Sequence, residues 1–185
     1  MAVTATNFEL LLETLKRAGA ALRDAEIPFA LGGGMAIWAH GGPETEHDLD
    51  FFVKPDDAER ALQALTEIGF RPEKPPEGWL YKAWDGDVLV DLIFEPAGMR
   101  VDDRLFRRAS ELEVNAVRIP VAAPKDVLVS KLLALREHEL DYDQLLEMAR
   151  TVREQIDWED VRLLTAHSPY AKAFFTLVDE LGVTA

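Results

Sequence analysis

Three aspartates with the spacing of metal ligands are the residues of this chain best suited to chemistry. Asp48 and Asp50 stand at the start of an apolar run, and the period of two of a β-strand places both carboxylates on one face. Asp91 interrupts the apolar, β-branched run Val88–Phe94, which has the composition of a buried strand. An ionised carboxylate there needs a cation or a hydrogen-bonding partner, and carboxylate oxygens are the ligands that Mg²⁺ prefers. The three aspartates therefore predict a magnesium site that also holds the phosphates of a nucleotide.

Three consecutive glycines precede these aspartates. Phe29–Leu31 is predicted as the end of a strand and Met35–Ala39 as the first turns of a helix, so Gly32, Gly33 and Gly34 fall in the turn between them. Glycines let backbone N–H groups approach an anion closely, and the N-terminus of the following helix favours negative charge at the same place. Glycine turns and Asp-x-Asp pairs also occur in ordinary surface loops, and it is their combination that favours a binding site.

At these residues the sequence resembles the nucleotidyltransferase superfamily that includes DNA polymerase beta, and within it the small bacterial proteins related to abortive-infection and toxin–antitoxin nucleotidyltransferases. The matching parts are the glycine pair and helix start at 33–36, the paired carboxylates at 48–50, Asp91, and the segment 119–134, whose lysine would face the nucleotide. The resemblance implies an α/β (α+β) fold. Residues 1–123 would form a mixed β-sheet nucleotidyltransferase core flanked by helices, and residues 124–185 a C-terminal helical subdomain packed on that core.

The resemblance also implies a site of six residues. Three carboxylates would hold two Mg²⁺ ions, with Asp91 on the ion that activates the acceptor, while two glycines would seat the triphosphate and one lysine would neutralise its charge. In chain order these residues are Gly33, Gly34, Asp48, Asp50, Asp91 and Lys131.

The implied reaction moves a nucleoside monophosphate from a nucleoside triphosphate to a hydroxyl of an acceptor, which is a small molecule, a protein or an RNA end. The resemblance further implies a toxin–antitoxin or defence setting, with a cognate antitoxin or another protein as partner.

Two departures from the family pattern leave other functions open. Many relatives have Ser or Thr after the glycines, where this chain has Met35, and an Arg or Lys in the loop before the carboxylates, where residues 43–47 include neither. Both changes weaken phosphate binding and leave metal binding intact. The alternative to an enzyme is a catalytically weak or inactive module that binds a nucleotide or a partner protein. A metal-dependent phosphohydrolase is a third interpretation.

Composition restricts the function further. The chain has 185 residues and a net charge of −14, which repels polyanions and argues against extended nucleic-acid binding, although bound cations would still let it hold one nucleotide. There is no cysteine, as in many proteins of a reducing cytoplasm, and no run approaches the ~20 apolar residues of a membrane span. We expect a soluble, cytoplasmic protein.

The remaining periodicities predict the elements that must position the site. Residues 70–76 are predicted as a turn-rich connection. Lys82 or Trp84 of the aromatic hairpin would either reach a nucleotide or serve packing and surface coverage, and we favour the second interpretation. The predicted elements are a helix at 6–24, a strand at 27–31, a helix at 58–68, a hairpin at 79–94, one or two short strands within 113–121, and amphipathic helices from 124 onward.

Four arginines form the one dense basic segment of the sequence. On a helix Arg100, Arg104, Arg107 and Arg108 would lie near one face. They would then either face a triphosphate or an acceptor, or pair with the acidic residues of the same segment. We favour the pairing with acidic residues.

Overall fold

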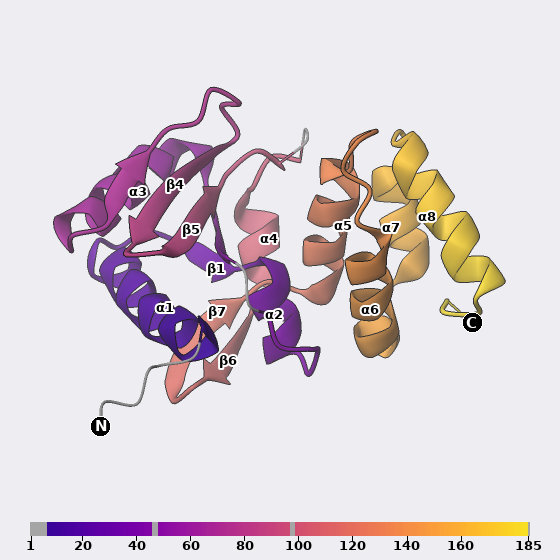
Figure 1. Cartoon of the computed structure of the whole chain (residues 1–185), viewed down its shortest axis with the longest axis horizontal. Coiled ribbons are helices and arrows are strands. Elements are labelled where there is room, and N and C mark those ends of the chain that lie inside the picture. The colour runs from indigo at the N-terminus through magenta and orange to yellow at the C-terminus, as the bar shows by residue number, and fades with distance from the viewer. Residues whose placement is uncertain (1–6, 46–47, 97–98, 185) are drawn as a thin grey trace.

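A seven-stranded mixed sheet forms the centre of the computed structural model, which describes residues 7–45, 48–96 and 99–184, and helices cover both of its faces (Figure 1). Strands β2 and β5 are parallel, as are β1 and β7, and the other neighbours are antiparallel. In the order in which they lie across the sheet, the strands are β3 (Arg71–Glu73), β4 (Leu80–Asp85), β5 (Val88–Ile93), β2 (Leu49–Val53), β1 (Phe29–Leu31), β7 (Val117–Val121) and β6 (Ser110–Val114).

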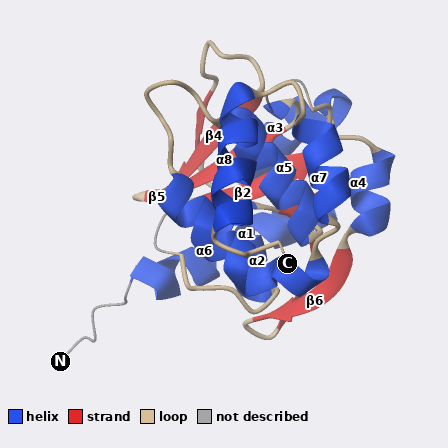
Figure 2. Cartoon of the chain, turned by 90° about the vertical axis from the view of Figure 1, so that its right-hand side faces the viewer, coloured by secondary structure: helices blue, strands red, loops and turns tan. Residues whose placement is uncertain are grey.

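The helices belong to two layers. The N-terminal helices α1 and α3 contact each other and the strands β4 and β5, while α5 contacts α2 and the last three helices on the other side (Figures 1 and 2). The helices are α1 (Asn7–Asp24), α2 (Gly33–Ala39), α3 (Ala58–Glu67), α4 (Asp103–Arg108), α5 (Pro124–Ala134), α6 (Tyr142–Val152), α7 (Trp158–Thr165) and α8 (Pro169–Glu180), with short 3₁₀ turns η1 (Pro55–Asp57) and η3 (Arg153–Gln155).

The pairing of β2 with β5 decides where the predicted carboxylates lie. In this parallel register Asp50 stands directly opposite Asp91. Because side chains alternate along a strand, Asp50 and Asp91 share one face of the sheet, and their neighbours Leu49 and Phe51 are completely buried in the core on the other. A shift of one residue in either strand would separate the two carboxylates.

The predicted α/β class and the predicted helices and hairpin are confirmed, whereas one predicted connection is wrong. Residues 71–73 were expected to lie in a connection, but they form β3, which pairs with β4. All three side chains are exposed, so no apolar alternation marks the strand, and Pro72 is tolerated because the strand lies at the edge of the sheet.

Three of the four clustered arginines form ion pairs among the described residues. The pairs are Arg100 with Asp56, Arg104 with Asp102, and Arg108 with Asp126. Pairing with acidic residues is thus what the structure shows, but two of the three partners lie outside the segment in which we expected them.

The Arg108–Asp126 pair ties α4 to the first turn of α5. Nε and Nη2 of Arg108 donate hydrogen bonds of 2.9 and 2.7 Å to the two carboxylate oxygens of Asp126. The Asp126 side chain is only 4% exposed, and this contact raises the pKa of Arg108 further above its ordinary value. The pair anchors the helix that carries Lys131.

We expect Arg108→Met to lower the free energy of unfolding by about 1–3 kcal/mol, because it leaves the buried Asp126 carboxylate without its partner while the arginine itself is partly exposed. Arg104→Met is the matched control on the same helix. Its pair is exposed and long, at 4.0 Å, so we expect a change within about 0.5 kcal/mol. Urea unfolding of the two variants measures the difference, and equal losses would contradict the anchoring role.

Candidate active site

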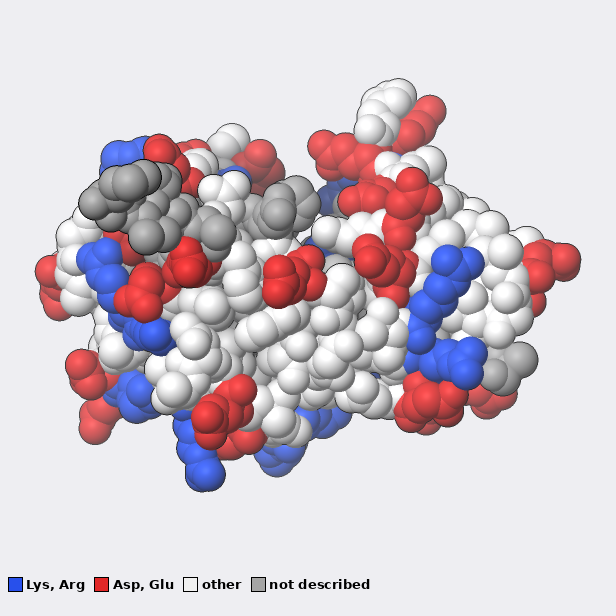
Figure 3. All heavy atoms as spheres, turned by 60° about the horizontal axis from the view of Figure 1, so that its bottom comes forward, with Lys and Arg blue, Asp and Glu red and all other residues white. Residues whose placement is uncertain are grey.

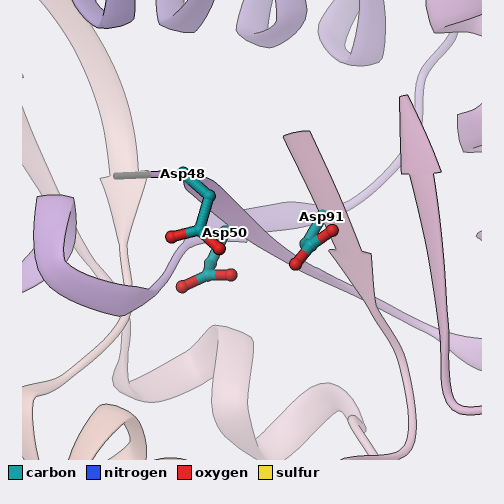
Figure 4. Close-up of side chains that lie close together, drawn as sticks. All are labelled: Asp48, Asp50 and Asp91. Carbon is teal, nitrogen blue, oxygen red and sulfur yellow. The ribbon is translucent and has the colours of Figure 1, made fainter. Parts of the chain in front are cut away.

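The three predicted aspartates converge on one point. One carboxylate oxygen from each of Asp48, Asp50 and Asp91 lies within 4.8 Å of the other two. Figure 4 shows Asp48 and Asp50 side by side and Asp91 facing them from the neighbouring strand. Asp48 lies immediately before β2, which begins at Leu49. The predicted convergence of the three carboxylates is therefore confirmed.

Burial and the charge of neighbouring carboxylates raise the pKa values of Asp50 and Asp91. Burial, and after it the negative charge of Asp48, raise the pKa of Asp50 to about 7 against the opposing charge of Lys131. Burial also raises the pKa of Asp91 to about 6, against the opposing charge of Lys82. A raised carboxyl pKa means that the folded chain loses stability as the pH rises from the ordinary value of 3.8 toward 7. A bound cation would offset that loss.

One oxygen of the cluster has no hydrogen-bond partner. Asp91 is 7% exposed, and its Oδ1 is the one buried side-chain oxygen or nitrogen without a hydrogen bond in the part of the chain that the structure describes. The Lys82 Nζ lies 3.9 Å from this atom, too far for a hydrogen bond. An orphaned buried oxygen beside two more carboxylates fits a divalent cation that takes oxygen ligands.

The glycine turn makes room for Asp50. Gly33 has φ +55, and a Cβ on it would lie 1.8 Å from Oδ2 of Asp50. The N–H of Gly32 also donates a 2.7 Å hydrogen bond to the carbonyl of Asp50. The helix begins at Gly33, two residues earlier than predicted, so Gly33 and Gly34 lie in its first turn. From the sequence we expected the glycines to let a bound anion approach the backbone. In the structure the carboxylate that lies against Gly33 is that of Asp50 itself.

Thr45 supplies a hydroxyl beside this turn, although Met35 stands where many relatives have Ser or Thr. The Met35 side chain is completely buried in the core, but a Cβ on Gly34 would lie 2.9 Å from Oγ1 of Thr45. Thr45 comes from the loop before the aspartates, and residues 46 and 47 of that loop lie outside the described residues. Sequence reasoning looked for the hydroxyl only at the helix start and missed this one.

A cavity of about 160 Å³ opens between the site face of the sheet and α5. Gly33 and the three aspartates line it on one side, and Lys131 lines it from α5, as the resemblance implied. The Lys131 Nζ donates a 3.3 Å hydrogen bond to Oε1 of Gln144 in α6. Five of the six predicted site residues thus border one cavity. Gln144 and the cavity-lining Trp79 were not predicted as site residues, and Lys82, for which we favoured packing, lies 3.9 Å from Asp91.

Gly34 borders a second cavity of about 420 Å³. The two cavities lie near each other, because the consecutive residues Gly33 and Gly34 line one each and Gln144, the partner of Lys131, lines the second one. Four acidic residues line this second cavity, namely Glu44, Asp141, Asp143 and Glu147. Its negative charge disfavours a polyanion that carries no cations.

The wider surface is also acidic. Figure 3 shows one face on which Asp and Glu side chains are scattered among uncharged residues and stand beside the Lys and Arg side chains. No helix in the described ranges is both long and apolar enough to cross a membrane.

Comparison with known families places most of the chain in one of them. Residues 2–178 match a family described as "Uncharacterised nucleotidyltransferase". Comparison with curated proteins gives no match.

Solved structures with the same fold include three nucleotidyltransferases or proteins like them. ANT(2'')-Ia in complex with adenylyl-2''-tobramycin has a TM-score of 0.64 at 15% identity, over 89% of this chain and 97% of that one. An antigenic nucleotidyltransferase-like protein from Paracoccidioides brasiliensis has a TM-score of 0.55 at 17% identity, over 92% and 88%. The lincomycin-bound lincosamide antibiotic adenylyltransferase LnuA has a TM-score of 0.50 at 14% identity, over 80% and 98%. At these identities the likeness establishes the fold.

The raised pKa of Asp50 predicts a pH-dependent metal affinity. Asp50 must be deprotonated to bind a cation, so protons compete below neutral pH. We expect the affinity for Mg²⁺ to fall about tenfold between about pH 8 and about pH 6, the factor for one proton with a pKa of about 7. Isothermal titration calorimetry measures it, and Asp50→Asn should bind weakly and keep only the about twofold dependence that Asp91, with its pKa of about 6, contributes. An affinity that stays constant over this range would contradict the prediction.

Gly33→Ala should damage the site far more than its backbone strain explains. Gly86 is the matched control, since its φ of +61 is close to that of Gly33 and a Cβ on it meets nothing within 4 Å. We expect Gly86→Ala to cost about 1–2 kcal/mol from left-handed backbone strain alone and to leave Mg²⁺ affinity unchanged. Gly33→Ala should cost more and should weaken Mg²⁺ binding, because the new methyl group displaces Asp50. Similar Mg²⁺ affinities in the two variants would show that Asp50 does not depend on Gly33.

Proposed function

The chain belongs to this nucleotidyltransferase family, and from that premise we propose that it transfers a nucleoside monophosphate from a nucleoside triphosphate to a hydroxyl of a small-molecule acceptor. The observation that carries the proposal is the convergence of Asp48, Asp50 and Asp91 within 4.8 Å, in a cavity that Gly33 and Lys131 also line. Three carboxylates gathered in one place suit cations and the phosphates that accompany them.

We propose that the three aspartates hold two Mg²⁺ ions. The oxygen ligand set and the orphaned Oδ1 of Asp91 support this assignment. When bound, the ions would polarise the α-phosphate and lower the pKa of the acceptor hydroxyl.

The chain's own residues would then act on the two substrates. The acceptor oxygen attacks the α-phosphorus, the bond from that phosphorus to the β-phosphate oxygen breaks, and pyrophosphate leaves. Asp91, with a pKa of about 6, is suited to take the proton of the acceptor hydroxyl near neutral pH. Lys131 would neutralise the triphosphate and Gln144 would orient it, while the first turn of α2 at Gly33 and Gly34 would offer backbone N–H groups to the phosphates.

Charge supports a small molecule as the acceptor in place of an RNA end. The net charge of −14 and the acidic cavity beside Gly34 both oppose a long polyanion. The adenylyl-tobramycin and lincomycin complexes of proteins with the same fold support ATP as the donor and a small hydroxyl compound as the acceptor.

The sequence resemblance to abortive-infection and toxin–antitoxin nucleotidyltransferases supports a cellular setting. We propose that the protein acts in the cytoplasm, where nucleoside triphosphates are available, within a defence or toxin–antitoxin pair and with a cognate antitoxin as its partner.

The test is to incubate the pure protein with Mg²⁺, α-labelled ATP and a cell extract of small molecules. We expect a labelled product together with pyrophosphate, and a loss of transfer of at least about 10²-fold in Asp50→Ala and in Asp91→Asn. Asp50→Ala should also lose tight binding of Mg-nucleotide. Asp87→Asn, an exposed aspartate in the β4–β5 turn, should leave both unchanged.

Each other outcome identifies a different function. Nucleotide that is retained without product would favour the binding module motivated by Met35. Release of inorganic phosphate in place of pyrophosphate would identify a phosphohydrolase. Unchanged Mg-nucleotide binding in Asp50→Ala would remove the site altogether.

A further inference from the structure

A tryptophan closes one side of the catalytic cavity. Trp79 precedes β4 and lines this cavity together with Ile93 and Pro96. Its backbone is held firmly, because its carbonyl accepts hydrogen bonds of 3.1 Å from the N–H groups of both Phe94 and Glu95. The side chain is half-buried, so part of the indole remains accessible beside the carboxylates.

The strand order places Trp79 on the side of the carboxylates that is remote from the phosphate-binding turn. Across the sheet the order is β4, β5, β2 and β1. Trp79 precedes β4, Asp91 lies on β5, Asp50 lies on β2, and Gly33 follows β1. Lys131 belongs with the glycine side, because α5 packs against α2. If the triphosphate lies between Gly33 and Lys131, the wall at Trp79 is left for the acceptor.

The chemistry of this wall is apolar with one hydrogen-bond donor. Ile93 and Pro96 are buried aliphatic residues. The indole N–H of Trp79 donates to no described residue, whereas the indole N–H groups of Trp84 and Trp158 donate to Glu73 and to the carbonyl of Arg153. A partly buried tryptophan thus offers both a flat apolar face and a free N–H to a ligand.

We propose that Trp79 is a specificity-determining residue that selects an acceptor whose reacting hydroxyl is carried on a saturated polyhydroxylated ring, such as a sugar ring. The proposal rests on the proposed transferase function. The C–H face of such a ring packs on the indole and on Ile93 and Pro96, and a ring oxygen accepts a hydrogen bond from the indole N–H. A rigid ring covers this flat wall with little loss of conformational entropy, unlike an open-chain alcohol. One hydroxyl of the ring then points toward Asp91, which lies on the same face of β5 as Ile93.

The test is a titration of the full chain labelled with nitrogen-15, followed through its four indole N–H signals in NMR. The signal of Trp79 is the one missing in Trp79→Phe. The ring probes are methyl α-D-glucopyranoside, methyl β-D-ribofuranoside and myo-inositol, and glycerol is the open-chain control. We expect at least one ring probe to shift the Trp79 signal with saturation at millimolar concentrations, the affinity of a small fragment, and glycerol to leave it in place. The signal of Trp84, which lies in β4 itself and does not line the cavity, is the internal control and should not move.

Two variants separate binding at the wall from other effects. Trp79→Ala should raise the KM for the best ring probe as acceptor at least about tenfold and leave the KM for ATP within about twofold, since the triphosphate lies on the other side of the carboxylates. Trp79→Phe should retain most of the affinity because the ring face remains. The indole signals of the other three tryptophans report whether each variant is folded.

Several outcomes would overturn the proposal. One is that no ring probe shifts the Trp79 signal more than glycerol does. Another is that the Mg²⁺ complex of α,β-methylene ATP shifts it instead, which would make Trp79 a platform for the nucleobase. A third is that Trp79→Ala changes the KM for the ring acceptor and the KM for ATP by the same factor. Failure of the transferase function itself gives a different result. In that case the ring probes would still shift the Trp79 signal, in the unsubstituted protein and in Asp50→Ala, but neither of these two proteins would release pyrophosphate.

Discussion

Repulsion among three carboxylates in a poorly hydrated place is the interaction on which the rest of this structure depends. Asp48, Asp50 and Asp91 are held within 4.8 Å by the parallel register of β2 and β5, not by contacts with one another. The two lysines nearest to them, Lys82 and Lys131, stand on opposite sides and reduce the repulsion without removing it. The folded chain keeps an unfavourable arrangement of charges that a bound cation would make favourable. This exchange of stability for ligand affinity is typical of a functional site.

The surrounding structure supplies what such a site requires. On one side, Gly33 leaves the space that the Asp50 carboxylate occupies, so the turn and the carboxylate are parts of one arrangement. On another side, α5 carries Lys131 toward the cavity and is anchored by the buried pair of Arg108 with Asp126. The fold thus holds the charged groups on elements whose positions are set elsewhere, by core packing and by an ion pair remote from the cavity.

The asymmetry of the cavity would divide the work between the two substrates of the proposed reaction. Backbone N–H groups and a lysine border the glycine side, where an anion is favoured, and an indole with aliphatic neighbours borders the opposite side, where an uncharged ring is favoured. Strong negative charge over the rest of the molecule, including the second cavity, limits anions to the place where cations would accompany them. Family membership supports a nucleotidyltransferase, and this asymmetry would distinguish the candidate acceptors of the proposed reaction.

The sequence by itself determined the three carboxylates of the candidate site, because each is marked by a local pattern: Asp48 and Asp50 alternate with apolar residues, and Asp91 interrupts a buried strand. It also determined the class of the elements around them, since strand and helix periods appear within a few residues. Only the tertiary structure decided that Gly33 makes room for Asp50, that Thr45 brings a hydroxyl to the turn, and that Trp79 closes the cavity. The exposed edge strand β3 likewise became visible only through its partner β4. The physical reason is that a periodic pattern encodes how a residue is buried within its own element, whereas these contacts depend on which strands pair and in what register.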